Sequence, residues 1–509
     1  MRWWLSLLLL LLLALPAHAA TRLGLLVTQE ELTIWRTRMT SSATINGVTF
    51  QSIYQNRLLA DANLFRAQSH PGGDGFWVGY TGAGCLWLDL NSSEANEPHG
   101  SRFFRGNGAD LNRSAFVYLL TGDVSYATPV KTELLNQIAQ AGTDWANTSK
   151  FCLSQSPPAG KTYLTPFEFV PWLMRLLLAY DFLNAGGYTG FTPTQKTQIE
   201  TWFTNAAVFF HGMEVLGYSF GCYQGIFSTP QDLTPIGGSP CSDNNLTLYF
   251  NGPTIKFATT WFFNQGTLAP LLDAAVGVLT NNATLKTYAT KAVTAFLTVG
   301  LTDNGAHDDF SRWQDCLPQY ECPGAMWAHA GGTYSALTQA MDILARTGDT
   351  SLYSRVVANQ TLGQSGASVG WQKAVTLWAQ MANKTTLLYG TTDVTHQTTA
   401  RLLSWDTDID PNNPGFVNTG NYYDFSSMAA NLFYQDAAVT TAMSRTLKGT
   451  NTNLAPASCN DQQFGGCFSG VWGFWPDLPF LYGNMQGVVN PYNLSAGVLA
   501  PPTNLRVVP

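Results

Sequence analysis

The sequence predicts an all-α fold, an (α/α) toroid or incomplete barrel of helical hairpins with irregular C-terminal loops. Three observations predict it. Apolar residues recur at helical spacing over long stretches, glycines that end helices are followed by aspartates that can cap the next one, and no strand pattern alternates with the helices. Helical hairpins in succession favour a toroid or solenoid over a βαβ fold.

Each expected helix is long and periodic enough to bury one face. The expected helices span residues 114–120, 126–141, 167–183, 192–210, 254–279, 283–299, 334–346 and 425–448. Gly122-Asp123 separates the first two, and Gly348-Asp349 follows the helix at 334–346. The repeated Gly-Asp pair predicts a helix, turn, helix unit that occurs twice.

The first 19 residues have the order of a secretory leader. Arg2 precedes an apolar run to Leu15, and Ala17-His18-Ala19 is a small-residue cleavage site. No later stretch approaches the roughly 20 apolar residues of a membrane span. We therefore expect a secreted or periplasmic protein without a membrane anchor, with one domain over residues 20–495 and a tail or linker at 496–509.

The net charge of the chain limits the classes of molecule that it is expected to bind. The full chain has a formal net charge of −7, and removal of Arg2 with the leader makes it −8. A nucleic-acid-binding protein would show a basic face, so nucleic acid is not expected as a partner. The same balance argues weakly against a long anionic polymer, although a local basic groove overrides the global sign.

Eight cysteines in an exported chain predict disulfides, because the compartment is oxidising and the number is even. Cysteines that are close in the sequence are expected to form disulfides with each other. The expected pairs are Cys316 with Cys322, Cys459 with Cys467, Cys222 with Cys241 and, by elimination, Cys85 with Cys152. No tight Cys-x-x-Cys or His/Cys cluster is present, so neither a metal nor another cofactor is expected.

Polar residues suited to an acidic sugar are concentrated between residues 261 and 349. They follow one another as Phe263-Asn264-Gln265-Gly266-Thr267, Asp303-Asn304-Gly305, Arg312, and Ala328-His329 leading to Tyr334. This order resembles the alginate lyase family of polysaccharide lyases, helical toroids that cleave polyuronates by β-elimination. The resemblance covers about residues 110–355, and Gln265 and Ala328 stand where the family has a histidine and a tyrosine.

The resemblance implies a lyase without an obligatory metal, acting on a uronic-acid polysaccharide such as alginate or glucuronan. Such an enzyme must neutralise the sugar carboxylate before a base can remove the C5 proton. Asn264 and Arg312 suit the neutralising role, because an amide and a guanidinium donate hydrogen bonds to a carboxylate. His329 is the first choice for the base and Tyr334 for the acid that protonates the departing O4.

Further residues are expected to bind substrate or to stand in for the base and acid. In the central stretch these are Gln265, His307, Trp313 and Tyr320, with His307 and Tyr320 in reserve for proton transfer. Arg102 and Arg105 lie in a glycine-containing loop that could grip carboxylates.

Structural explanations compete with each assignment. Asn264 could cap a helix, Arg312 could pair with Asp308, Asp309 or Asp315, His329 could be a bonded core histidine, and Tyr334 could serve packing. Two other functions also remain open. One is a glycoside hydrolase on the same fold, with candidate carboxylates Asp308, Asp309, Glu321 and Glu168. The other is a carbohydrate-binding protein without catalysis.

Overall fold

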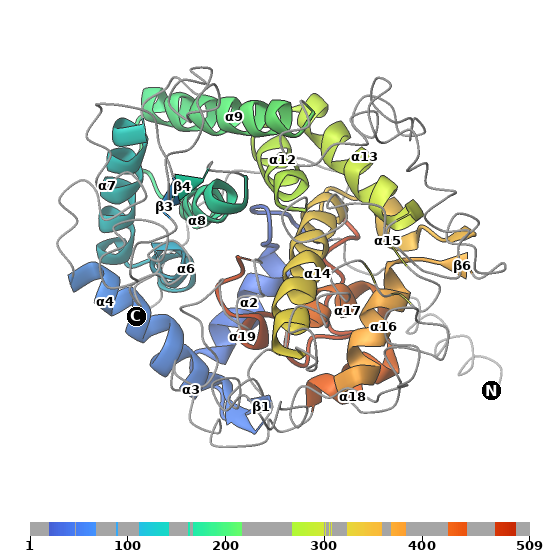
Figure 1. Cartoon of the computed structure of the whole chain (residues 1–509). Coiled ribbons are helices and arrows are strands. Elements are labelled where there is room, and N and C mark those ends of the chain that lie inside the picture. The colour runs from blue at the N-terminus through green and yellow to red at the C-terminus, as the bar shows by residue number, and fades with distance from the viewer. Residues whose placement is uncertain are drawn as a thin grey trace, which may run out of the picture.

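The computed structural model describes residues 20–45, 47–67, 88–89, 111–141, 161–162, 166–215, 267–299, 301, 305, 307, 323–358, 368–382, 426–444 and 474–494. These residues are mostly helical, with very little sheet, which confirms the all-α prediction (Figure 1). Within them, none of the helices has the length and apolar character that a membrane crossing needs. The expected leader, residues 1–19, lies outside the described part.

The N-terminal helices were missed by the sequence analysis. They are α2 (Gln29–Arg38), α3 (Phe50–Ile53), the π-helix η1 (Tyr54–Leu59) and α4 (Ala60–Ala67). A sequence signal for α2 was present. Thr28 accepts a hydrogen bond from the backbone of Glu31, and the Glu31 side chain accepts one from the backbone of Thr28. This Thr-x-x-Glu capping box marks a helix start.

The central helices overlap the expected ones, and two differ in where they begin. They are α6 (Leu111–Thr121), α7 (Val124–Ala141), α8 (Pro166–Ala185), α9 (Pro193–Val215), α12 (Leu268–Leu279), α13 (Ala283–Val299) and α14 (Pro323–Ala345). The helix expected at 254–279 begins at Leu268, after a turn at Thr267, and residues 254–266 lie outside the described part. The helix expected at 334–346 begins at Pro323. Gly122 and Gly348 have φ of 74° and 96°, which suits glycine at a helix end. The second Gly-Asp turn leads only into the four-residue α15 (Ser351–Ser354), so the repeat is shorter there than expected.

The expected helix at 425–448 is wrong as a single element. It is divided into α17 (Ser426–Tyr434) and α18 (Ala437–Ser444), and the remaining C-terminal helices are α16 (Trp371–Ala382) and α19 (Leu478–Tyr482). Gln435 has φ of 49°, which ends α17. Asp436 then accepts from the backbone nitrogen of Ala438 at 2.8 Å and starts α18.

Short antiparallel strand pairs account for the sheet. They are β1 (Thr44–Ile45) with β2 (Val48–Thr49), β3 (Leu88–Asp89) with β4 (Lys161–Thr162), and β5 (Val357–Ala358) with β6 (Ser368–Val369). In the sequence, β3 begins three residues after Cys85, and β4 begins nine residues after Cys152. All eight cysteines lie outside the described residues, so the expected disulfides stay predictions.

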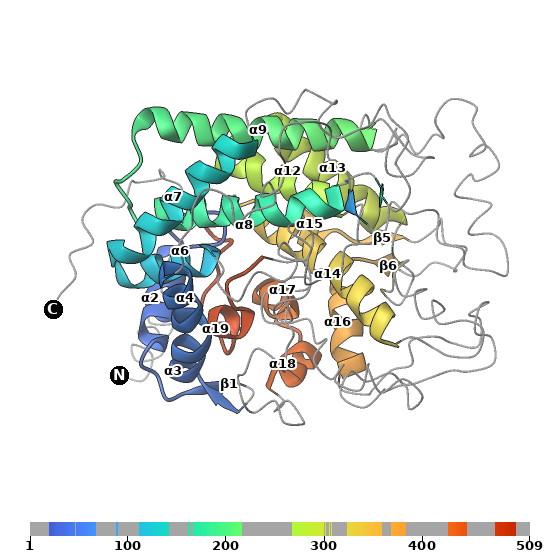
Figure 2. The ribbon, with the colours of Figure 1, turned by 60° about the vertical axis from the view of Figure 1, so that its left-hand side comes forward.

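The helices pack in two sets (Figures 1 and 2). In the first set each helix contacts the next, in the order α2, α6, α8, α12, α14, α17 and α19, and α19 contacts α2 again. In the second set α4 and α7 pack on α6, α9 and α13 pack on α12, and α16 packs on α17 and α18. Within the described part, one hydrophobic cluster runs from Leu25 to Tyr492 and so includes both ends.

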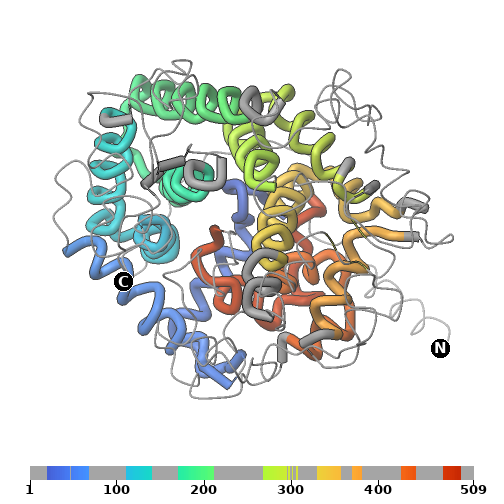
Figure 3. The backbone as a smooth tube through the Cα atoms, in the orientation of Figure 1, coloured from blue at the N-terminus to red at the C-terminus, as the bar shows by residue number. Residues whose placement is uncertain are grey.

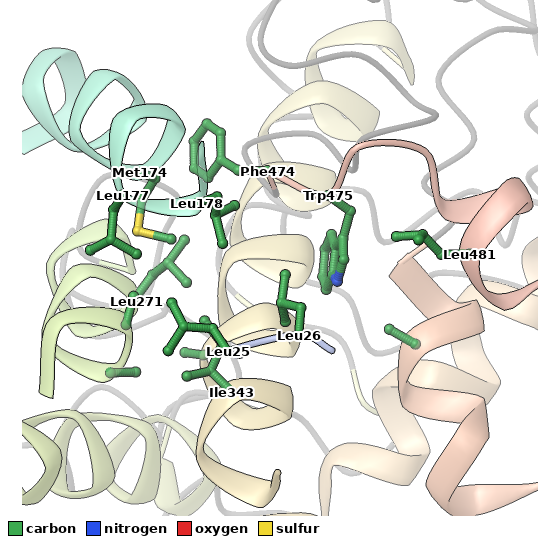
Figure 4. Packing of buried hydrophobic residues seen from close by; sticks show 14 of the residues in the cluster. Leu25, Leu26, Met174, Leu177, Leu178, Leu271, Ile343, Phe474, Trp475 and Leu481 are labelled. Carbon is green, nitrogen blue, oxygen red and sulfur yellow. The ribbon is translucent and has the colours of Figure 1, made fainter. Parts of the chain in front are cut away.

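The segment 20–27 enters the middle of the first set of helices (Figure 3). Leu25 and Leu26 are buried there, among side chains of α8, α12 and α14 and beside Trp475 (Figure 4). Full burial of each such leucine is worth about 1.5–3 kcal/mol. Position 24 requires a residue without a side chain, because a Cβ there would lie only 2.6 Å from the Asp181 carboxylate.

Residues 474–494, which we name the closing segment, join the two ends of the described chain. The Trp35 indole nitrogen donates to the carbonyl of Leu481 at 2.8 Å, and Arg38 donates to the same carbonyl at 2.9 Å. Arg57 forms a buried ion pair with Asp477 at 2.7 Å. The N-terminal helices are therefore held by residues more than 400 positions later in the sequence.

Candidate functional site

Helix α14 carries two of the four predicted catalytic residues. It begins at Pro323, directly after Cys322 in the sequence, and a proline is tolerated in a first turn. It starts earlier than the expected residue 334 and therefore includes His329. The backbone of His329 lies in the second turn of α14, and its side chain is outside the described part.

Tyr334 is fully buried on α14. Its ring stacks on Trp371 with centroids 5.3 Å apart and lies 5.1 Å from the ring of Trp378. Its hydroxyl is 3.0 Å from the Ser427 hydroxyl of α17. These are the surroundings of a packing residue that joins α14 to α16 and α17, so the packing explanation accounts for Tyr334 in this conformation.

His307 is also fully buried. Its ring lies 5.9 Å from the ring of Phe296 on α13. Burial lowers the pKa of His307 to about 3, and a hydrogen bond with the backbone of Ala330 opposes that shift only in part. An efficient base or acid has a pKa near the working pH, so a histidine with this pKa is poorly matched to proton transfer at neutral pH. Its expected role in substrate binding stays a prediction.

Gly305 belongs to the Asp303-Asn304-Gly305 motif and lies against the first turn of α16. Its φ is 94°, and a Cβ at this position would lie 2.5 Å from the backbone nitrogen of Ala374. Only glycine tolerates both the φ value and the close approach. Gly305 and His307 therefore hold one end of the segment with Arg312 against α16, α13 and α14, while Pro323 begins α14 at the other end.

The Asn264 motif directly precedes α12. Thr267 is the residue before α12 and is buried, and α12 packs against α14. The helix that follows Asn264 and the helix that contains His329 are thus neighbours. Most predicted site residues lie outside the described part, and their positions stay predictions: Arg102, Arg105, Asn264, Gln265, Arg312, Trp313 and Tyr320.

A buried charge cluster at the C-terminal end of α14 was not predicted. Arg346 donates to both carboxylate oxygens of Glu31, at 2.6 and 2.8 Å, and to Asp342 at 3.0 Å. Tyr492 donates to the other oxygen of Asp342 at 2.8 Å. Burial raises the pKa of Asp342, and Arg346 opposes the shift. The spacing Asp342 to Arg346, four residues on one helix, was the available signal.

Asp181 of α8 is a second buried carboxylate that was not predicted. It accepts from the backbone nitrogen of Leu25 at 2.8 Å. Burial raises its pKa to about 7, and the Leu25 hydrogen bond and the charge of Arg22 oppose the shift. A shifted pKa is a weak pointer to function. Here the contacts of Asp181 are with the segment 20–27, so the residue anchors that segment.

The described residues contain no group of three or more His, Cys, Asp or Glu side chains placed to hold a metal ion. What they contribute to the candidate site is the packed pair of helices α12 and α14, which in the sequence adjoin or contain the predicted polar residues. Comparison of the sequence with models of protein families gives no match, and a search of curated proteins gives none either.

Proposed function

We propose that this chain is a secreted polysaccharide lyase that cleaves a uronic-acid polysaccharide by β-elimination. One observation supports this more than any other. The three motif segments, around Asn264, Gly305 and His329, attach to the neighbouring helices α12 and α14 or to elements packed on them. The described residues beside motifs up to 65 residues apart in the sequence therefore lie in one region, as a shared site requires.

The packing of the helices supports a toroid of the (α/α) type. Each helix from α2 to α19 in the first set contacts its neighbour, and the last contacts the first. In such an arrangement the loops between helices gather at the ends, where they are free to build a site. Arg312 lies between α13 and α14 in the sequence, in a connection of this kind under the proposed fold.

In the proposed mechanism Asn264 and Arg312 bind the carboxylate of the sugar. Their hydrogen bonds stabilise the negative charge that builds up as the C5 proton leaves. His329 removes that proton, and an acid protonates the departing O4. The burial of Tyr334 and its bond to Ser427 favour Tyr320 over Tyr334 as the acid. Tyr334 then has a supporting role, in which it holds α14 against α16 and α17.

The test is a screen of the purified full chain on alginate, glucuronan and hyaluronan. A lyase produces an unsaturated uronate that absorbs in the near ultraviolet. New reducing ends without that absorbance would identify a hydrolase instead, and binding without either product would identify a carbohydrate-binding protein. The proposal fails if no polyuronate yields the unsaturated product.

Four variants test the assigned roles. Arg312→Ala and His329→Ala should each lower kcat/KM by a factor of about 100 or more, the range found when one charge-stabilising donor or one general base is removed. Tyr320→Phe should abolish most turnover, whereas Tyr334→Phe should retain it. Turnover unchanged in both Arg312→Ala and His329→Ala would overturn the site assignment. Loss in Tyr334→Phe with an unchanged melting temperature would return the acid role to Tyr334.

A further inference from the structure

The chain contains Asn-x-Ser/Thr sequons that the proposed function does not use. Their asparagines are Asn91, Asn112, Asn147, Asn245, Asn282, Asn359, Asn383 and Asn493. Asn112, Asn282 and Asn493 are described by the structure. All three have the side-chain amide that can accept an N-linked glycan, but they differ in how deeply the fold buries that amide.

The sequon at Asn112 is built into the core. Asn112 is the second residue of α6 and is 2% exposed. Its amide nitrogen Nδ2 donates to the carbonyl of Phe474 at 3.2 Å. The sequon serine, Ser114, is fully buried and donates to the carbonyl of Tyr126 at 3.1 Å. Arg113 between them donates to the carbonyl of Pro476 at 3.0 Å.

The amide nitrogen is the atom that an N-linked glycan would occupy. In the transfer, Nδ2 displaces the diphosphate from C1 of a polyprenyl-diphosphate-linked oligosaccharide. The C1–O bond breaks, an N–C1 bond forms, Nδ2 loses a proton and the polyprenyl diphosphate leaves with the bonding electrons. On Asn112 the new sugar would occupy the place of Phe474 in the closing segment. Protein interiors are close-packed and have no room for a sugar ring.

The other two sequons lie at the surface. Asn282 is half-buried in the turn between α12 and α13, where its Oδ1 accepts from the backbone nitrogens of Thr284 and Leu285. These bonds use the oxygen and not the nitrogen that a glycan would occupy. Asn493 is exposed, and its backbone carbonyl accepts from the nitrogen of Ala20 at 2.6 Å. Neither side chain is part of the core.

We propose that Asn282 and Asn493 accept an N-linked glycan, whereas Asn112 must stay unmodified for the chain to reach this fold. The closing segment joins the chain ends through contacts near Asn112, so a glycan at that position would keep residues 474–477 away from α6. A compartment that modifies nascent chains would therefore divert a fraction of the molecules from folding.

The test is production of the full chain in a eukaryotic secretory host, followed by glycopeptide mass spectrometry. The folded fraction is defined as monodisperse protein with a cooperative thermal transition. In that fraction we expect glycan on Asn282 and Asn493 and none on Asn112. Ser114→Ala, which removes the sequon at Asn112, should increase the folded yield severalfold. Folded protein with glycan on Asn112 would overturn the proposal, as would bare Asn282 and Asn493.

Two controls separate the glycan from the substitution. Thr284→Ala removes the sequon at the half-buried Asn282 and should leave the folded yield unchanged. Ser114→Ala also loses a buried hydrogen bond, so wild type and this variant are compared in a bacterial periplasm, where the variant should give no gain. If Ser114→Ala does not fold in the periplasm, the wild-type chain is produced in a eukaryotic host unable to transfer the glycan. Its folded yield should then exceed the yield in the glycosylating host. An unchanged yield in that host contradicts the proposal.

Discussion

Arg346 is the central residue of the buried charge cluster at the end of α14. Its guanidinium is fully buried and bridges Glu31 of α2 to Asp342 of α14. Burial alone would lower its pKa, but the charges of Asp342 and Glu31 hold the pKa well above its usual value. The cation is therefore permanent, and its loss would leave two buried carboxylates without a counter-charge.

Arg346→Met should therefore destabilise the fold strongly. Removal of one partner from a buried ion pair costs about 3–5 kcal/mol, because the remaining charge stays buried without compensation. Arg346→Lys is the matched control, since it keeps the charge and loses only the two-pronged contact with Glu31. Urea unfolding of the three proteins measures the difference. A loss below about 1 kcal/mol in Arg346→Met would show that the carboxylates find other partners.

The raised pKa of Asp181 makes the free energy of unfolding depend on pH. Its folded pKa of about 7 lies above the ordinary value of 3.8 for an aspartate, so the folded state binds a proton more tightly than the unfolded state does. The stability from this group is complete below the unfolded pKa and is lost as the pH rises through about 7. One pKa unit corresponds to about 1.4 kcal/mol, so the loss over a shift from 3.8 to about 7 is on the order of 4 kcal/mol.

Asp181→Asn tests this directly. Asparagine keeps an oxygen that accepts from the Leu25 nitrogen, but it does not ionise. The variant should match wild type only below about pH 4, where Asp181 is protonated in both the folded and the unfolded state. It should exceed wild type in unfolding free energy at pH 8, as measured by urea unfolding across that range. A difference that stays constant with pH would mean that Asp181 does not titrate between these values.

At the scale of the element, Gly305 lies against the first turn of α16, seven residues before Arg312 in the sequence. Gly305→Ala places a Cβ 2.5 Å from the backbone of Ala374 at a φ of 94°. The φ value alone costs about 1–2 kcal/mol, and the backbone clash adds to it. We expect a lower melting temperature and, under the proposed function, reduced turnover because the segment with Arg312 shifts.

Gly348→Ala is the matched control for Gly305→Ala. Gly348 has nearly the same φ, 96°, but a Cβ there would meet nothing within 4 Å. Both variants share the conformational cost, and only Gly305→Ala has the clash. Thermal melts and turnover assays of both proteins should therefore show the larger loss in Gly305→Ala. Equal losses would mean that the contact with α16 gives way at little cost.

The elements also show how far the sequence predicts this molecule. The long helices α7, α9 and α13 follow from local periodicity and turn residues, which the sequence contains. The division of 425–448 at Gln435 was missed because a non-glycine residue with positive φ leaves little sequence signal. At the site, the chemistry that the residue types predicted stays a prediction. Packing was already an explanation for Tyr334, because aromatic residues at helical spacing usually face a core, and its contacts with α16 and α17 agree with it. The burial of His307 was missed, because it depends on contacts with α13 and α14 that no local pattern indicates.

At the scale of the whole molecule, the closing segment is what joins the two ends of the described chain. It gives Trp475, Phe480 and Tyr482 to the core, all of them fully buried. It also supplies Asp477, which pairs with Arg57 and caps α19 through the backbone nitrogen of Phe480. All of these contacts are made by residues 474–494, so we expect the fold to depend on the closing segment.

Two truncations test this dependence. A chain that ends at Ser495 lacks the predicted tail and should melt within a few degrees of the full chain. A chain that ends at Gly473 loses the closing segment, which leaves Arg57 buried without its carboxylate and exposes the apolar faces of α2 and α6. Burial of each large side chain is worth about 1.5–3 kcal/mol, so three lost residues already approach the 5–15 kcal/mol stability of a typical domain. The shorter chain should therefore show no cooperative thermal transition by circular dichroism, and a cooperative melt near that of the full chain would mean that the N-terminal helices hold together without it.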